Sequence, residues 1–181
     1  MTNPNTLEHL VDYLRHRVPM TGHFQIMAGD LTGDSLTLCA PLEANLNDKQ
    51  TAFAGTLATL CTLSGWAMTS LVCGERGLEA DIAVVRSDIA YLRPCGDDPI
   101  TARCFRPDAP VVTQFLDEMQ SRARAELELR AEVRSREKQA VEFVGRYCAR
   151  RRTRGSLRSF GRFATNGSGA TLSPERIRGR Q

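Results

Sequence analysis

A polar loop that runs directly into an uncharged segment holds the residues best suited to chemistry. The loop contains the carboxylate Asp48 beside the amide Asn47, and the uncharged segment opens at Ala54 and Gly55. The first N–H groups of a helix have no partner within the helix, and with the helix dipole they stabilise a developing negative charge. A carboxylate and an amide delivered to such a helix start suit the attack of water on a carbonyl group.

Each residue of this stretch receives a role under that hypothesis. Asp48 is the candidate general base, and Asn47 would hold the water with it. The backbone N–H groups of Ala54, Gly55 and Thr56 would hold the carbonyl oxygen. The competing interpretation gives Asp48 a purely structural role, as a helix cap or as part of a turn, and nearby threonines are alternative caps.

Other nucleophiles in the chain lack the partners that they need. Ser64 lies two turns into the helical segment without a His or Lys beside it, which disfavours a covalent serine mechanism. Every histidine lies at or before His23, so neither a Cys–His pair nor the His–acid pair of a dehydratase is expected. Two of these histidines lie seven residues apart without a third ligand, and no metal site is predicted. Asp88 and Tyr91 are expected to face outward rather than to line a cleft.

The charge is divided unevenly along the chain. The 181 residues carry a net charge of +3, but nine Arg and one acidic residue lie between Arg150 and Gln181. We predict one mildly acidic domain over residues 1–150, and a disordered Arg-rich tail over residues 151–181 that is too poor in apolar side chains to fold alone. Because Arg is preferred over Lys throughout the chain, the tail gives little evidence of a nucleic-acid or membrane partner, and neither is expected.

The six cysteines lie within apolar runs and include no C-x-x-C pair. This pattern is typical of reduced, buried thiols rather than of a disulfide framework or a zinc site. The N-terminal residues lack the basic and apolar regions of an export signal. We therefore expect a cytoplasmic protein.

Hydrophobic periodicity places the polar loop on an α+β scaffold. The expected helices are Thr6–Val18, a long uncharged helix within residues 50–74 that opens at Ala54, and Val111–Ser121. The expected strands are His23–Ala28, Ser35–Ala40, Asp81–Leu92, Ile100–Phe105, Ala123–Arg134 and Gln139–Cys148, the last two joined as a hairpin. The long helix could cross a membrane, but its six hydroxyl side chains and two glycines favour a soluble core helix packed on one antiparallel sheet.

Three runs of residues resemble the hotdog-fold thioesterases of the family named for the C-terminal domain of bacterial YiiD. They are APL-x-x-N-x-ND-K-x-TAF-x-G from Ala40, GW at Gly65, and SDIAYLRP from Ser87. The resemblance covers residues 7–150. It implies a hotdog fold, in which an antiparallel sheet wraps around one long central helix, with paired subunits and an acyl-thioester site between them. The loop positions that match are Asn45, Asn47, Asp48, Lys49, Thr51, Phe53 and Gly55, and those on the helix are Gly65 and Trp66.

Two loop positions depart from the family pattern. Gln50 and Ala54 stand where the family usually has glycine. A methyl group at Ala54 leaves its N–H available but narrows the approach of a substrate carbonyl to the backbone. This departure keeps a second function open, that of a non-catalytic acyl-thioester binding or regulatory module.

The resemblance and the chemistry of the loop lead to one main prediction. The protein hydrolyses acyl-CoA or a related acyl-carrier thioester, as a homodimer or a higher homo-oligomer, with no cofactor besides the CoA of its substrate. The expected catalytic residues are Asp48, Asn47 and Gly55, and the expected substrate-binding residues are Asn45, Thr51, Phe53, Ala54 and Thr56.

Overall fold

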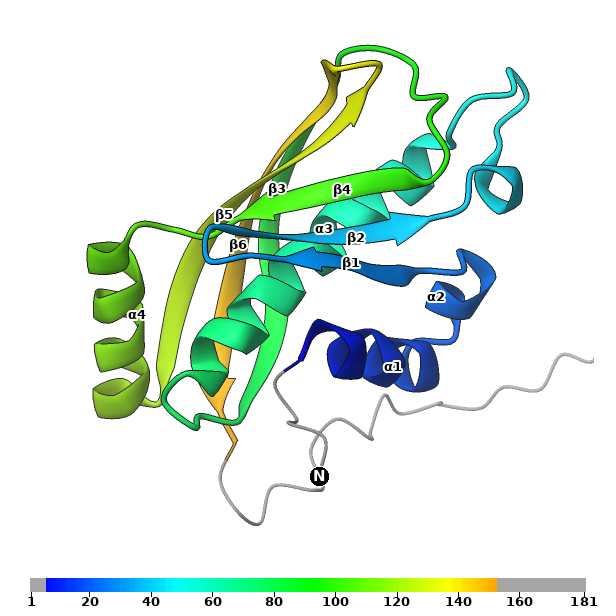
Figure 1. The fold of residues 1–181 in the computed structure, drawn as a ribbon. Helices are drawn as coiled ribbons and strands as arrows, with labels where there is room; N and C mark the ends of the chain where they lie inside the picture. Colours follow the sequence, from blue (N-terminus) through cyan, green and yellow to red (C-terminus); the bar gives the residue numbers. More distant parts are fainter. Residues whose placement is uncertain (1–5, 153–181) are drawn as a thin grey trace, which may run out of the picture.

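A six-stranded antiparallel sheet wraps around one long helix (Figure 1). The computed structural model describes residues 6–152, so nearly all of the predicted tail lies outside the described residues. The helices are α1 (Leu7–Arg17), α2 (Met20–His23), the short 3-10 helix η1 (Glu43–Asn45), α3 (Ala54–Gly74) and α4 (Ala109–Arg122). The strands are β1 (Met27–Leu31), β2 (Ser35–Ala40), β3 (Ala80–Tyr91), β4 (Ile100–Phe105), β5 (Arg124–Ser135) and β6 (Lys138–Arg151).

The strands follow the order β1-β2-β4-β5-β6-β3, and every neighbouring pair is antiparallel. Ser135 pairs with Lys138 across a two-residue turn in which Arg136 and Glu137 both have positive φ, as tight hairpin turns require. Alternate residues of β5 are buried, which explains the alternation of apolar and charged side chains in its sequence. The predicted hairpin is therefore confirmed.

The core is centred on α3. Eleven of its 21 residues are buried, and strands from both halves of the sheet pack against it. Gly65 lies against Tyr147 of β6, where a methyl group would overlap the aromatic ring, and the Tyr147 hydroxyl donates a hydrogen bond to the Thr62 backbone oxygen at 2.9 Å. Among the described residues α3 alone is long and apolar enough to span a membrane, and its place inside the sheet makes it a core helix.

The N-terminal segment differs from the expectation at one point. Thr6 caps α1, since its side chain accepts a hydrogen bond from the His9 N–H, and the helix ends before Pro19 as predicted. The strand expected from His23 is wrong in its first half, because Met20–His23 forms the short helix α2 and β1 begins only at Met27. Pro19 supplies a preset φ that favours a further helical turn. The other expected elements agree with the structure to within three residues.

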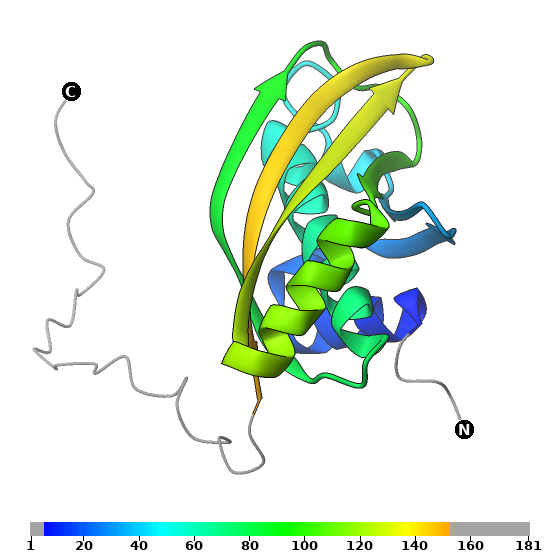
Figure 2. The same cartoon turned by 90° about the vertical axis from the view of Figure 1, so that its left-hand side faces the viewer.

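One side of α3 is left uncovered by the sheet. β3 is an edge strand, and its residues 83–88 are exposed. Figure 2 shows β3 curving along the rim of the sheet beside β6. Helix α1 packs beside β1 at the opposite edge and also touches α3. A seam therefore runs between α1 and β3, and α3 lies at its base.

Candidate active site

Asn45 joins the polar loop to the first turn of α3. Its buried side chain donates hydrogen bonds to the backbone oxygens of Phe24 and Pro41, at 3.0 and 2.8 Å, and accepts one from the Thr56 hydroxyl at 2.9 Å. Its backbone oxygen accepts a fourth bond from the N–H of Phe53 at 2.8 Å. A buried amide with its donors and acceptor all paired is a rigid joint. Asn45 and Thr56 thus support the site from beneath its surface.

Asn47 folds the loop around its own side chain. Leu46 and Ala52 form an antiparallel bridge, and between them the Asn47 N–H donates to the Thr51 backbone oxygen at 2.8 Å. The side-chain oxygen of Asn47 accepts from the N–H groups of Lys49 and Thr51, at 2.8 and 3.2 Å, and its amide donates to the Thr51 hydroxyl at 3.0 Å. These bonds define the shape of the loop tip.

Asp48 stands at that tip and faces solvent. Its side chain is 79% exposed, and both carboxylate oxygens lie 2.9 Å from the ammonium nitrogen of Lys49. An exposed pair of this kind contributes little to stability. Within the described residues the carboxylate makes no hydrogen bond to α3. Asp48 is therefore exposed at the loop tip and does not cap α3.

The first turn of α3 has no side-chain cap. Phe53 is the N-cap residue, and the first backbone bond of the helix runs from the Leu57 N–H to the Phe53 oxygen at 3.1 Å. The N–H groups of Ala54, Gly55 and Thr56 precede that bond and have no partner within the helix. Ala54 is exposed and Gly55 half-buried, whereas Thr56 is buried. The reachable donor pair at the helix start is thus Ala54 and Gly55, where the helix dipole favours negative charge.

Phe53 and Gly55 are packed against each other. A methyl group on Gly55 would overlap the ring of Phe53, so only glycine allows the ring to lie across the helix start. The ring itself is 51% exposed. It therefore forms an apolar wall beside the two N–H groups.

Tyr91 of β3 reaches the first turn of α3, although it is 49% exposed. Its hydroxyl donates to the Ala54 backbone oxygen at 3.2 Å. Burial raises the pKa of Tyr91, so the phenol keeps its proton at neutral pH. The sequence pattern is consistent with this contact. Side chains alternate between the two faces of a strand, so Tyr91 lies on the same face of β3 as Ile89, whose side chain packs on the core. Asp88 has the opposite phase and is exposed.

Gln50 occupies a backbone position that suits glycine. Its φ is 59°, in the left-handed region that side chains with a Cβ disfavour. The glycine of the family pattern at this position therefore has a conformational reason. The second departure is Ala54, an exposed residue that adds a methyl group at the first position of α3.

The remaining nucleophiles are enclosed. Ser64 is fully buried, and its hydroxyl donates to the Cys61 backbone oxygen at 2.8 Å. Burial raises the pKa of Cys61 and of Cys104 to about 12, which keeps both as neutral thiols. In residues 6–152 no group of three or more His, Cys, Asp or Glu side chains gathers closely enough to hold a metal ion.

The wrapped sheet, the central helix and the open helix start define a hotdog domain. A family model described as "Putative thioesterase (yiiD_Cterm)" matches residues 7–151, and the chain belongs to this family. The predicted fold and family are therefore confirmed.

Solved structures agree with this assignment. A protein of unknown function from Chlorobaculum tepidum is 28% identical, with a TM-score of 0.75 over 79% of this chain and 93% of that one. A "putative thioesterase" from Shewanella oneidensis is 26% identical, with a TM-score of 0.69 over 79% and 96%. The phenylacetic acid degradation protein PaaI from Thermus thermophilus shares the fold at 20% identity, with a TM-score of 0.52 over 73% and 98%.

Proposed function

We propose that the protein hydrolyses the thioester bond of acyl-CoA or of a related acyl carrier. The observation that carries the proposal is the uncapped helix start at Ala54 and Gly55, presented beside a rigid loop in a member of a thioesterase family. The N–H pair would donate hydrogen bonds to the carbonyl oxygen, and these two bonds and the helix dipole would stabilise the negative charge that develops on this oxygen.

The reaction needs one general base and no covalent intermediate. Asp48 takes a proton from a water molecule as the water oxygen attacks the carbonyl carbon. The tetrahedral oxyanion is held by the N–H groups of Ala54 and Gly55. When it collapses, the carbon–sulfur bond breaks and the departing CoA thiolate takes up the proton, which gives a carboxylic acid and free CoA. Asn47 supports this step by fixing the loop tip through its hydrogen bonds with Thr51. Thr51 and Phe53 line the approach of the substrate to the helix start.

We propose further that Asp48 acts on the helix start of a second subunit. Its carboxylate points to solvent and makes no hydrogen bond to α3 within residues 6–152. The edge strand β3 exposes Val84, Val85 and Tyr91, each at least 42% accessible, which favours pairing with another copy of the chain. A homodimer, or a higher assembly built from it, would bring Asp48 of one subunit to Ala54 and Gly55 of the other.

The partners and the location of the protein follow from the same proposal. The substrate is an acyl thioester on CoA or an acyl carrier, with no other cofactor. The four buried thiols suit a reducing compartment, which supports the cytoplasm as the location. Neither nucleic acid nor a membrane is required as a partner.

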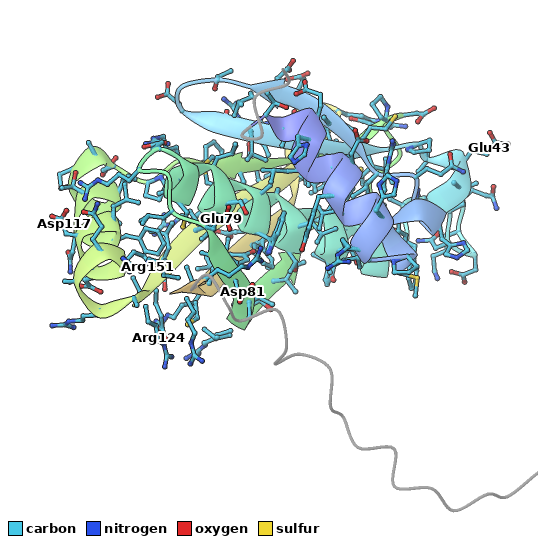
Figure 3. The ribbon with its side chains drawn as sticks, turned by 90° about the horizontal axis from the view of Figure 1, so that it is seen from below. Glu43, Glu79, Asp81, Asp117, Arg124 and Arg151 are labelled. Carbon is cyan, nitrogen blue, oxygen red and sulfur yellow. The ribbon has the colours of Figure 1, made fainter. Side chains whose placement is uncertain are left out.

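A panel of short, medium and long acyl-CoAs tests the enzyme directly. Release of free CoA should be followed by chromatography, because the partly exposed Cys39 and Cys148 would react with a thiol reagent. Asp48→Asn should lower kcat/KM by about a hundredfold or more, the usual contribution of a general base. Glu43→Gln, an exposed carboxylate on η1 (labelled in Figure 3), is the matched control and should leave the rate unchanged. An equal effect of both substitutions would remove Asp48 from its role.

Mixing two inactive variants tests the location of the site. An Asp48→Asn subunit keeps an intact helix start, and a Gly55→Val subunit keeps Asp48. If the two residues meet across the dimer, each mixed dimer contains one complete site of two. An equimolar mixture, in which half of the dimers are mixed, should therefore regain about a quarter of the wild-type activity. No recovery in mixtures with proven subunit exchange would place both residues in one chain.

The second candidate function is a non-catalytic acyl-thioester binding or regulatory module. The exposed methyl group of Ala54 favours it, because this group narrows the approach to the helix start. Saturable binding of acyl-CoA without CoA release at any chain length would support this function and reject hydrolysis. Ala54→Gly should raise turnover if the methyl group is the obstacle.

A further inference from the structure

A groove between α1 and β3 exposes the middle of α3. We call it the α1–β3 groove; its volume is about 700 Å³, and its walls include Tyr13 and Leu14 of α1, Leu63 and Trp66 of α3, and Ile82 and Val84 of β3. Figure 3 looks toward this side, with α1 in front and Glu79 and Asp81 labelled near the start of β3. The wall residues named are mostly apolar, and the lining also includes Arg17 and the ion pair between Arg152 and Asp81. A groove of this composition suits an aliphatic chain whose end groups remain in water.

The groove reaches α3 as near to its start as Thr62. Five of the nine half-buried positions of α3 recur at helical spacing and form a stripe on the side facing the seam: Gly55, Thr59, Thr62, Leu63 and Trp66. Eleven residues separate Gly55 from Trp66, which is about 16 Å along a helix that rises 1.5 Å per residue. β3 runs alongside in the opposite direction, since Tyr91 touches Ala54 while Ile82 lines the groove.

A pair of aromatic rings divides the groove from a second hollow. Tyr13 and Trp66 are stacked, with ring centroids 5.9 Å apart and an angle of 5° between the rings. The second hollow has a volume of about 350 Å³ and lies toward the C-terminal end of α3, where it reaches Ser70 and Cys73. Both hollows are lined by Tyr13 and Trp66, so the stacked rings form part of the wall between them, together with Ala80, Ile82 and Arg152.

From this arrangement we infer that the α1–β3 groove holds the acyl chain of a medium-length, straight-chain thioester, and that the Tyr13–Trp66 stack ends the chain site. The occupant follows from the half-buried stripe of α3, because this stripe leads from Gly55 to the groove and a chain attached to a carbonyl held at Ala54 and Gly55 would extend along it. The stack then sets the longest chain that fits. The inference rests on the proposed function for the position of the carbonyl, but binding of the chain is measurable without any hydrolysis.

Trp66 is the single tryptophan of the chain, so its fluorescence reports occupancy of the groove. The probes are S-alkyl-CoA thioethers, which cannot be hydrolysed, with ethyl, butyl, octyl, dodecyl and hexadecyl chains. We expect saturable changes in Trp66 emission, with affinity rising about fourfold per methylene group up to a limiting length and no further. S-ethyl-CoA should leave the emission unchanged.

Two results of this titration would overturn the inference. Calorimetric binding of S-octyl-CoA or S-dodecyl-CoA without a change in Trp66 emission would place the chain elsewhere. If Trp66 emission changes with protein concentration as dimers form, but does not change when the thioethers are added, a second copy of the chain fills the groove. Loss of hydrolysis alone leaves the titration intact, so failure of the proposed function and failure of this inference are distinguishable.

Substitutions at the stack test its role in limiting chain length. Tyr13→Ala joins the two hollows and should extend the limiting chain by two or more methylene groups, whereas Tyr13→Phe preserves the ring and should leave the limit unchanged. Leu63→Phe fills the groove on the near side of the stack and should shorten the limit. Tyr13 is 41% exposed, which allows truncation without a large loss of packing. An unchanged limit in Tyr13→Ala and Leu63→Phe, both folded by circular dichroism, would reject the stack as the end of the site.

Discussion

The hydrogen bond from Thr56 to Asn45 is the contact through which the loop is fixed to α3, and Thr56→Val tests it. The two atoms lie 2.9 Å apart, and both residues are at most 3% exposed. Valine keeps the size and the branched Cβ of threonine, so neither packing volume nor helix preference changes much. The substitution removes the hydroxyl that donates to the side-chain oxygen of Asn45.

The expected cost is that of a buried acceptor without its donor. In residues 6–152 the Thr56 hydroxyl makes the only hydrogen bond to this oxygen. Leaving such a group unpaired costs about 1–3 kcal/mol, and we expect a loss of about 2 kcal/mol in the free energy of unfolding. For a domain of this size that corresponds to a fall of about 4–8 °C in Tm.

Thr69→Val is the matched control on the same helix. The Thr69 hydroxyl is equally buried, but it donates to the Gly65 backbone oxygen at 2.9 Å, which the helix already pairs. Its loss leaves no orphaned group, and the change should stay within about 0.5 kcal/mol. Urea unfolding of both variants should shift the midpoint at constant slope. Equal losses in the two variants would refute the assignment of Asn45 and Thr56 as the joint of the site.

Three further predictions concern stability. Gly65→Ala should lower the free energy of unfolding by about 2 kcal/mol, because the new methyl group overlaps Tyr147, and Gly65→Ala with Tyr147→Leu should recover part of the loss in urea titrations. Gln50→Gly should raise Tm, since it relieves a left-handed backbone conformation worth about 1 kcal/mol; a lowered Tm would contradict this. Burial raises the pKa of three thiols to about 11 or 12, compared with 9.0 when exposed, and these are Cys61, Cys73 and Cys104. Above pH 9 the unfolded chain therefore loses thiol protons that the folded chain keeps, so the urea midpoint should fall as pH rises from 9 to 11, and less steeply in Cys61→Ala.

The fold could be predicted from the sequence because its hydrophobic patterns are long and regular. The uncharged helix at Ala54 and the alternation in residues 124–135 each match one secondary structure only, and tight turns separate them. The segment before β1 was less informative, since a single helical turn after Pro19 has too few residues to show a period.

The candidate site was proposed from the sequence, and the structure supplied its geometry. The loop and the helix start indicated Asn47, Asp48 and Gly55, and the family resemblance added Asn45, but the sequence did not show which of these residues are buried. The two asparagine side chains of this loop have different hydrogen-bond partners. Asn45 donates to Phe24, which is far away in the sequence, whereas Asn47 bonds to Thr51 within the loop tip. Such partners are set by the path of the chain, and residue type does not reveal them.

What the sequence by itself determined is the local chemistry: the start of a helix, a carboxylate in the loop just before it, and a core segment free of charge. These follow from neighbours in the chain. The tertiary structure decided which groups meet across long separations, and it brought Tyr91 to Ala54 and Tyr13 to Trp66. Those contacts exist only because the sheet wraps α3 and leaves one seam open, since closure of the sheet is a property of all six strands together.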